Sequence, residues 1–97
     1  MPGEHRGIVA SIPLVGKEGP WKILQDLPGV YVSPVFRRHL NATDNIEKTG
    51  LELARRMIRD LFVLGIDGVH LMNFGVSAGA LADLIRETRE MFRASAA

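Results

Sequence analysis

The pentapeptide Gly75-Val76-Ser77-Ala78-Gly79 is the part of the chain whose residue types and spacing most directly suggest chemistry. It fits the pattern G-x-S-x-G, in which a serine at a sharp turn between a strand and a helix is the nucleophile of acyl transfer. Such a serine also needs a general base and an oxyanion hole. His70 falls within the expected strand, Asp83 follows in the same expected helix as Ser77, and the glycine-rich oxyanion segment of patatin-like lipases is absent.

A simpler interpretation of the pentapeptide is structural. Ser77 stands where the N-cap of the following helix is expected, and serine is a favoured N-cap residue. Gly75 and Gly79 would then supply backbone freedom around the turn. We favour this capping interpretation over a nucleophile, and we note that a helix N-terminus at 77–80 could also bind an anion such as a cofactor phosphate.

Hydrophobic periodicity predicts the elements around this motif. Apolar residues recur at helical spacing over 50–64 and again over 81–92. Between them, the turn at 65–68 leads into a short apolar strand that ends at Met72-Asn73-Phe74. An order of helix, strand and helix is typical of parallel sheets, in which ligands gather at the carboxyl ends of the strands. Asn73 and Phe74 are therefore predicted to lie at a ligand-binding edge.

The first half of the chain predicts a second strand and two short helices. The run over 7–12 is apolar and rich in β-branched residues, and Pro13 bounds it, so we expect a buried strand there. Thr43 or Asp44 would form a capping box with Glu47 at the start of the long helix. The short helices are expected over 17–27 and 35–40.

The composition bounds the function. A chain of 97 residues makes one small domain with a marginal core. It has no cysteine, and its three histidines lie far apart in sequence, so we expect no metal site. A net charge of +1 without a basic stripe argues against nucleic acid. No apolar run reaches the roughly 20 residues that span a bilayer, and no signal peptide is visible, so we expect a cytoplasmic protein with no membrane partner.

Both expected strands are almost wholly apolar, which favours burial on both faces, as in a parallel sheet. Two strands cannot cover their own faces and edges, and a (βα)8 barrel needs about 250 residues. We therefore interpret 7–95 as a single α/β segment with two parallel strands and three to four helices, after a flexible N-terminus at 1–6. Further strands would come from a partner chain, a homo-oligomer or a longer protein.

Four motifs along the chain occur together in one enzyme family. They are Ile12-Pro13-Leu14-Val15-Gly16-Lys17, Leu27-Pro28-Gly29-Val30-Tyr31-Val32-Ser33-Pro34, Gly50-Leu51-Glu52-Leu53-Ala54 and Gly65-Ile66-Asp67-Gly68-Val69-His70. Their order and spacing resemble the C-terminal end of the methylenetetrahydrofolate reductases. In that family a strand ends in a proline-containing loop, "G-(I/L)-E-(I/L)-A" opens a long helix, and "G-V-x-G-(I/V)-H" lies on the last barrel strand. The resemblance covers most of residues 7–75.

The resemblance implies a flavin-dependent TIM barrel that uses NAD(P)H to reduce 5,10-methylenetetrahydrofolate to 5-methyltetrahydrofolate. The segment would be a partial (βα)8 barrel, namely its last βα units. The loops over 13–17 and 73–76 would then contact FAD and the folate or nicotinamide ring that stacks against it. Lys17, Asn73 and Phe74 are the predicted substrate- or cofactor-binding residues, as contacts rather than as proton-transfer groups.

The chain departs from the family at several positions. The family commonly has an aromatic or large apolar residue near the position of Lys17, and its arginine after the last strand falls on Val76. Its catalytic acid and main flavin-binding loops lie on earlier strands, so the isolated segment is expected to be inactive and its catalytic residues are unknown. His70 would be a barrel-interior histidine. Two other hypotheses remain: a non-catalytic α/β interaction module, and a serine hydrolase with Ser77 as nucleophile.

Overall fold

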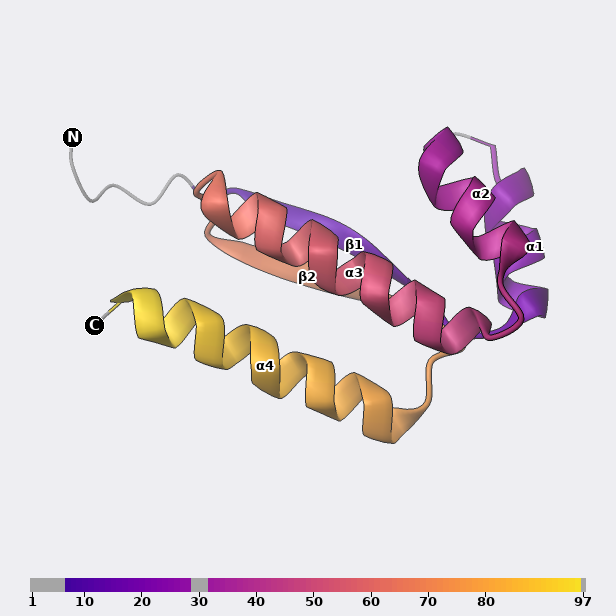
Figure 1. Ribbon diagram of the computed structural model, residues 1–97. Coiled ribbons are helices and arrows are strands. Elements are labelled where there is room, and N and C mark those ends of the chain that lie inside the picture. The colour runs from indigo at the N-terminus through magenta and orange to yellow at the C-terminus, as the bar shows by residue number, and fades with distance from the viewer. Residues whose placement is uncertain (1–6, 29–31, 97) are drawn as a thin grey trace.

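The computed structural model describes residues 7–28 and 32–96 (Figure 1). The elements in chain order are β1 (Val9–Val15), α1 (Glu18–Asp26), α2 (Pro34–Ala42), α3 (Ile46–Val63), β2 (Gly68–Phe74) and α4 (Ala78–Ala96). The α/β class is confirmed, with two parallel strands and four helices among the described residues. The expected flexible segment 1–6 lies outside the described residues.

The two strands are adjacent and parallel, in a register that runs from Val9 opposite Gly68 to Val15 opposite Phe74. The Gly16 N–H donates to the Phe74 carbonyl oxygen at 3.0 Å and extends the ladder past the end of β1. The prediction that Pro13 ends the strand is wrong. Because backbone groups alternate in direction along a strand, the Gly16 bond places the Pro13 nitrogen on the side away from β2, where no N–H is required.

The two faces of the sheet differ in what covers them. We call one the helix face, because Ile12 and Leu14 pack there against α3 and α4. It forms a core cluster with residues of both helices and of the loop before α4, namely Leu51, Ala54, Ile58, Val76 and Leu84. Figure 1 shows α3 lying along the strands and α4 running beside β2.

We call the opposite side the open face. It carries alternate residues of both strands, among them Val9, Ser11, Pro13, His70 and Met72. Val9 is 58% exposed, and Ser11 and His70 are also exposed. The prediction that both faces are buried is therefore wrong for this part of the sheet, because no described element forms a layer over it.

A second core cluster lies at the carboxyl ends of the strands, where α1 and α2 stand in Figure 1. We call it the cap cluster: Val15, Trp21, Leu24, Phe36 and Leu40. The Trp21 and Phe36 rings meet edge to face at 5.8 Å, and the Trp21 indole N–H donates to the Asn41 side-chain oxygen at 2.8 Å. The hydrogen bond satisfies the only polar atom of the buried indole, so this cluster is well specified.

Helix α3 approaches β1 closely at Gly50. A Cβ atom there would overlap the carbonyl oxygen of Val15. Gly50 is buried near the start of α3, so only a residue without a side chain lets the helix backbone lie against the strand end. This contact gives a packing reason for the glycine that opens the third sequence motif.

Helix α3 begins one or two residues later than the expected capping box. Its N-cap is Asn45, whose side-chain oxygen accepts from the Lys48 N–H at 3.1 Å. The capping box of Thr43 or Asp44 with Glu47 is therefore wrong. The Thr43 hydroxyl oxygen instead accepts from the Asn45 N–H at 3.1 Å and holds the turn before the helix.

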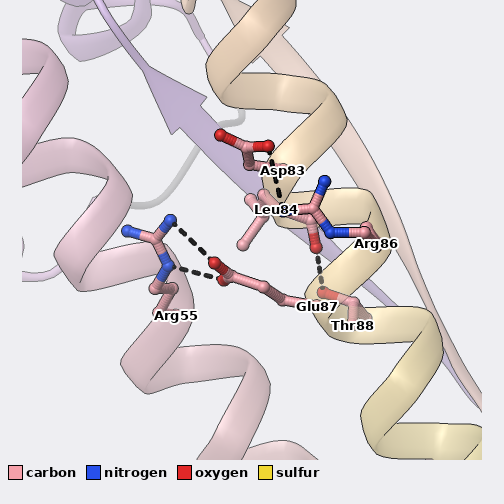
Figure 2. A network of polar contacts seen from close by, with 6 residues as sticks. All are labelled: Arg55, Asp83, Leu84, Arg86, Glu87 and Thr88. Atoms are coloured by element: carbon pink, nitrogen blue, oxygen red, sulfur yellow. Dashed lines mark hydrogen bonds and ion pairs between the residues drawn. The ribbon is translucent and has the colours of Figure 1, made fainter.

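Polar and aromatic contacts attach α4 to α3. The Arg55 guanidinium pairs with the Glu87 carboxylate at 2.9 Å (Figure 2). Nearer the end of both helices, the Phe62 and Phe92 rings meet edge to face at 4.9 Å. Within the described ranges, no helix is long and apolar enough to cross a membrane.

Candidate functional site at the carboxyl ends of the strands

The loops that follow the two strands meet at a pair of glycines. A Cβ atom on Gly16 would lie 2.5 Å from the Gly75 carbonyl oxygen and from the Val76 nitrogen. Gly75 has a φ of 96°, in the left-handed region that favours glycine, and a Cβ there would lie 3.0 Å from the Lys17 side chain. The fold therefore brings two loops from distant parts of the sequence into contact, as the parallel strands predicted.

Lys17 lies at this contact and is exposed. It is the N-cap residue of α1, but its side chain makes no capping hydrogen bond. Among residues 7–28 and 32–96, its ammonium group has no ion-pair or hydrogen-bond partner. The charge of Lys17 is thus available to an anionic or polar group at the carboxyl ends of the strands.

Asn73 and Phe74 lie at the predicted strand end, but their side chains point to opposite faces of the sheet. The Asn73 side-chain oxygen accepts from the Val76 N–H at 2.7 Å, and its amide donates to the Val76 carbonyl oxygen at 3.0 Å. Asn73 therefore fixes the shape of the loop before α4. Phe74 is half-buried and packs against the cap cluster on the other face.

The structure thus groups only two of the three predicted binding residues. Lys17 and Phe74 flank the meeting point of the loops, whereas Asn73 is turned toward the helix face. Sequence spacing had placed Asn73 and Phe74 together, because neighbouring residues share a strand end. The alternation of side chains across a strand separates them.

Ser77 caps α4, which confirms the capping interpretation. Its hydroxyl oxygen accepts from the Ala80 N–H at 3.4 Å. The hydroxyl also donates to one oxygen of Glu47 at 3.3 Å, and the Ser77 N–H donates to the other at 3.1 Å. No histidine in the described part of the chain hydrogen-bonds to Ser77, so the arrangement there lacks the usual general base of a serine hydrolase.

The Glu47 carboxylate takes the position that an external anion would occupy at the N-terminus of α4. Sequence reasoning assigned Glu47 to a capping box on its own helix and missed this role. No local signal could have revealed it, because Glu47 and Ser77 come from different elements that only the tertiary fold brings together.

The open face also carries His70 and an apolar cavity. His70 lies within β2 as expected, and its side chain is exposed on the open face. The cavity, of about 310 Å³, lies between the strands and the cap cluster. It is lined by Ser11, Pro13, Leu24, Val32, Ser33, Phe36, Met57 and Met72.

The described residues contain no group of three or more His, Cys, Asp or Glu that could hold a metal ion. The fold therefore defines an α/β segment. Its candidate site is the contact between the loops after β1 and β2, next to the open face of the sheet. Comparisons with protein-family models, curated proteins and solved structures gave no match. A function for the chain rests on its motifs and on the geometry above.

Proposed function

We propose that this chain is the C-terminal βα segment of a methylenetetrahydrofolate reductase-like flavin barrel. The observation that carries the proposal is the meeting of the Gly16-Lys17 and Gly75-Val76 loops at the carboxyl ends of two adjacent parallel strands. Ligands of barrel enzymes bind at this end of the strands. The first motif that resembles the reductases, over 12–17, ends at this contact. The fourth, over 65–70, includes the first residues of β2, which leads to it.

The open face supports a barrel origin. In a (βα)8 barrel, one face of every strand packs against the outer helices and the other fills the barrel interior. Ile12 and Leu14 correspond to the first face, since α3 and α4 cover them. Ser11, His70 and Met72 correspond to the second, which other strands would cover.

The residues present fit one edge of a flavin or folate ring rather than a whole cofactor. Lys17 offers an unpaired cation, and Phe74 with the neighbouring cavity offers an apolar surface. Val76, at the family's arginine position, is only 6% exposed and belongs to the core, so that ionic contact is lost. FAD would supply hydride transfer between NAD(P)H and the folate, and this chain's residues would bind and orient one side of the ring.

Co-purification tests the proposal. The chain would be expressed with the remaining strands of a methylenetetrahydrofolate reductase that lacks its own C-terminal βα units, and the complex would be isolated through a tag on this chain. We expect a complex that retains flavin absorbance. Lys17→Ala should weaken flavin binding by about tenfold, the effect of losing one charge-assisted contact.

Lys22→Ala is the matched control, because Lys22 is exposed and its ion pair with Glu18 lies within α1. It should leave flavin binding unchanged. A folded complex without flavin would contradict the proposal and would favour the second candidate, a non-catalytic α/β interaction module. The observation behind that candidate is the exposure of large apolar side chains at the end of α3, where Val63 is 78% and Leu64 is 79% exposed.

A further inference from the structure

The two outer edges of the sheet are not equivalent. The outer edge of β1 lacks a backbone donor at Pro13, and proline is one of the devices that discourage strand addition. The strand β2 contains no proline. Because the Phe74 carbonyl points to β1, alternation directs the backbone groups of Val69 and Leu71 toward the open edge. The edge of β2 is therefore the better template for another strand.

A cavity of about 400 Å³ lies along this edge, between β2 and α4. Residues 68–71 of the strand line one side of it. The other side is a stripe on α4 at helical spacing, formed by Ile85, Thr88, Arg89 and Phe92. A strand added to β2 would place every second side chain in this cavity, against the α4 stripe.

Arg89 is the charged residue among those that line the cavity. Its neighbours on the two helices are paired, Arg86 with Asp83 and Arg55 with Glu87 (Figure 2). Within the ranges that the structure describes, Arg89 has no ion-pair partner. A strand that fills the cavity would leave this guanidinium beside it, so an acidic side chain on that strand is the complementary choice.

We infer that the outer edge of β2 is a strand-addition site for an extended segment of a different protein chain, which presents an acidic side chain to Arg89 between apolar ones. Neither described strand of a second copy fits, because β1 and β2 contain no acidic residue. The inference deepens the proposed function, because it states the chemistry of the strand that would pair with β2. It rests on the proposed function for one point, namely that further strands come from another chain.

Labelled peptides test the inference without flavin. One peptide contains the order Thr-Val-Thr-Glu-Thr-Val. In an extended strand, its glutamate lies on the same face as the two valines. A matched peptide has lysine in place of glutamate. Fluorescence anisotropy should show the glutamate peptide binding at least tenfold more tightly, and Arg89→Glu should reverse the preference. Arg56→Glu is the control, since Arg56 is exposed on α3 and does not line the cavity.

Amide hydrogen exchange locates the contact. Binding of the glutamate peptide should slow exchange at Val69 and Leu71 and leave Ser11, on the edge of β1, unchanged. Equal binding of the two peptides, protection at Ser11, or a homodimer that excludes the peptide would overturn the inference. A flavin complex that forms while both peptides fail to bind would overturn it alone, whereas peptide binding without any flavin complex would contradict only the proposed function.

Discussion

The helix face and the open face of the sheet come from the same two strands. Helices cover the first face, whereas much of the second is exposed. Ile12 is 2% exposed and Leu14 is fully buried, whereas Val9, on the same strand, is 58% exposed. The helices α3 and α4 cover the first face. The helices α1 and α2 cover the second face only at the strand ends, around Val15, and no described element covers it at Val9, Ser11 and His70. The difference indicates that the helix face and the cap cluster hold the fold together, whereas the exposed part of the open face and the sheet edges are open to other molecules.

The largest expected effect comes from shortening one side chain on each face and comparing the losses in free energy of unfolding. Leu14→Ala should lower the free energy of unfolding by about 2–5 kcal/mol, because it leaves a cavity in the core beneath α3. Val9→Ala should cost less than about 1 kcal/mol, because its side chain is largely in water. Urea denaturation followed by circular dichroism measures both. Similar losses would mean that the open face is covered in solution.

A second test concerns the contact of α3 with the strand end. Gly50→Ala should lower stability by about 2–3 kcal/mol, because the new methyl group overlaps the Val15 carbonyl oxygen and forces the helix away. Gly79→Ala in α4 is the control, with open space around its Cβ position. That change should raise stability by up to about 1 kcal/mol through helix propensity. A neutral Gly50→Ala would mean that α3 does not contact the Val15 carbonyl oxygen in solution.

A smaller effect is expected where α4 is capped. Ser77→Ala should cost about 1 kcal/mol through the loss of the cap. Glu47→Gln should cost about 0.3–1 kcal/mol, because it removes the negative charge at the N-terminus of α4. The double variant should cost less than the sum, since the two side chains share a hydrogen bond. Strict additivity in thermal or chemical unfolding would show that they act separately.

The smallest effect is expected at the ion pair between α3 and α4. Glu87→Gln should lower stability by less than about 1 kcal/mol, because both partners are more than a third exposed. The loss should shrink as salt is raised. Glu90→Gln, at an exposed position one turn along, is the control and should have no effect. A large loss that persists in high salt would mean that α4 depends on this pair.

Much of the fold follows from the sequence. The periodicity over 50–64 predicted most of α3, and the apolar run before Phe74 predicted where β2 ends. The errors arise where tertiary context decides. Pro13 can lie within β1 because its nitrogen faces the outer edge of the sheet. Glu47 makes no capping box on its own helix, and its carboxylate accepts hydrogen bonds from Ser77 instead. Burial on both faces could not be judged from the strands, since their composition does not say which layers are present.

The sequence predicted which loops meet at the strand ends and only some of the contacts between them. The parallel strands indicated that the loops after β1 and β2 lie at the same end of the sheet, and the structure brings Lys17 to the loop after β2. Asn73 and Phe74 share the strand end, as predicted, but their side chains lie on opposite faces and the Asn73 amide is bonded to the Val76 backbone. The contact between Gly16 and Gly75 could not be derived from either loop alone.

Native mass spectrometry of the chain, purified from its own source without refolding, shows directly whether it assembles with other strands around a flavin. We expect an assembly that is heavier than the chain, contains a different polypeptide and carries the mass of FAD. A ligand-free monomer or a homo-oligomer of this chain would contradict it.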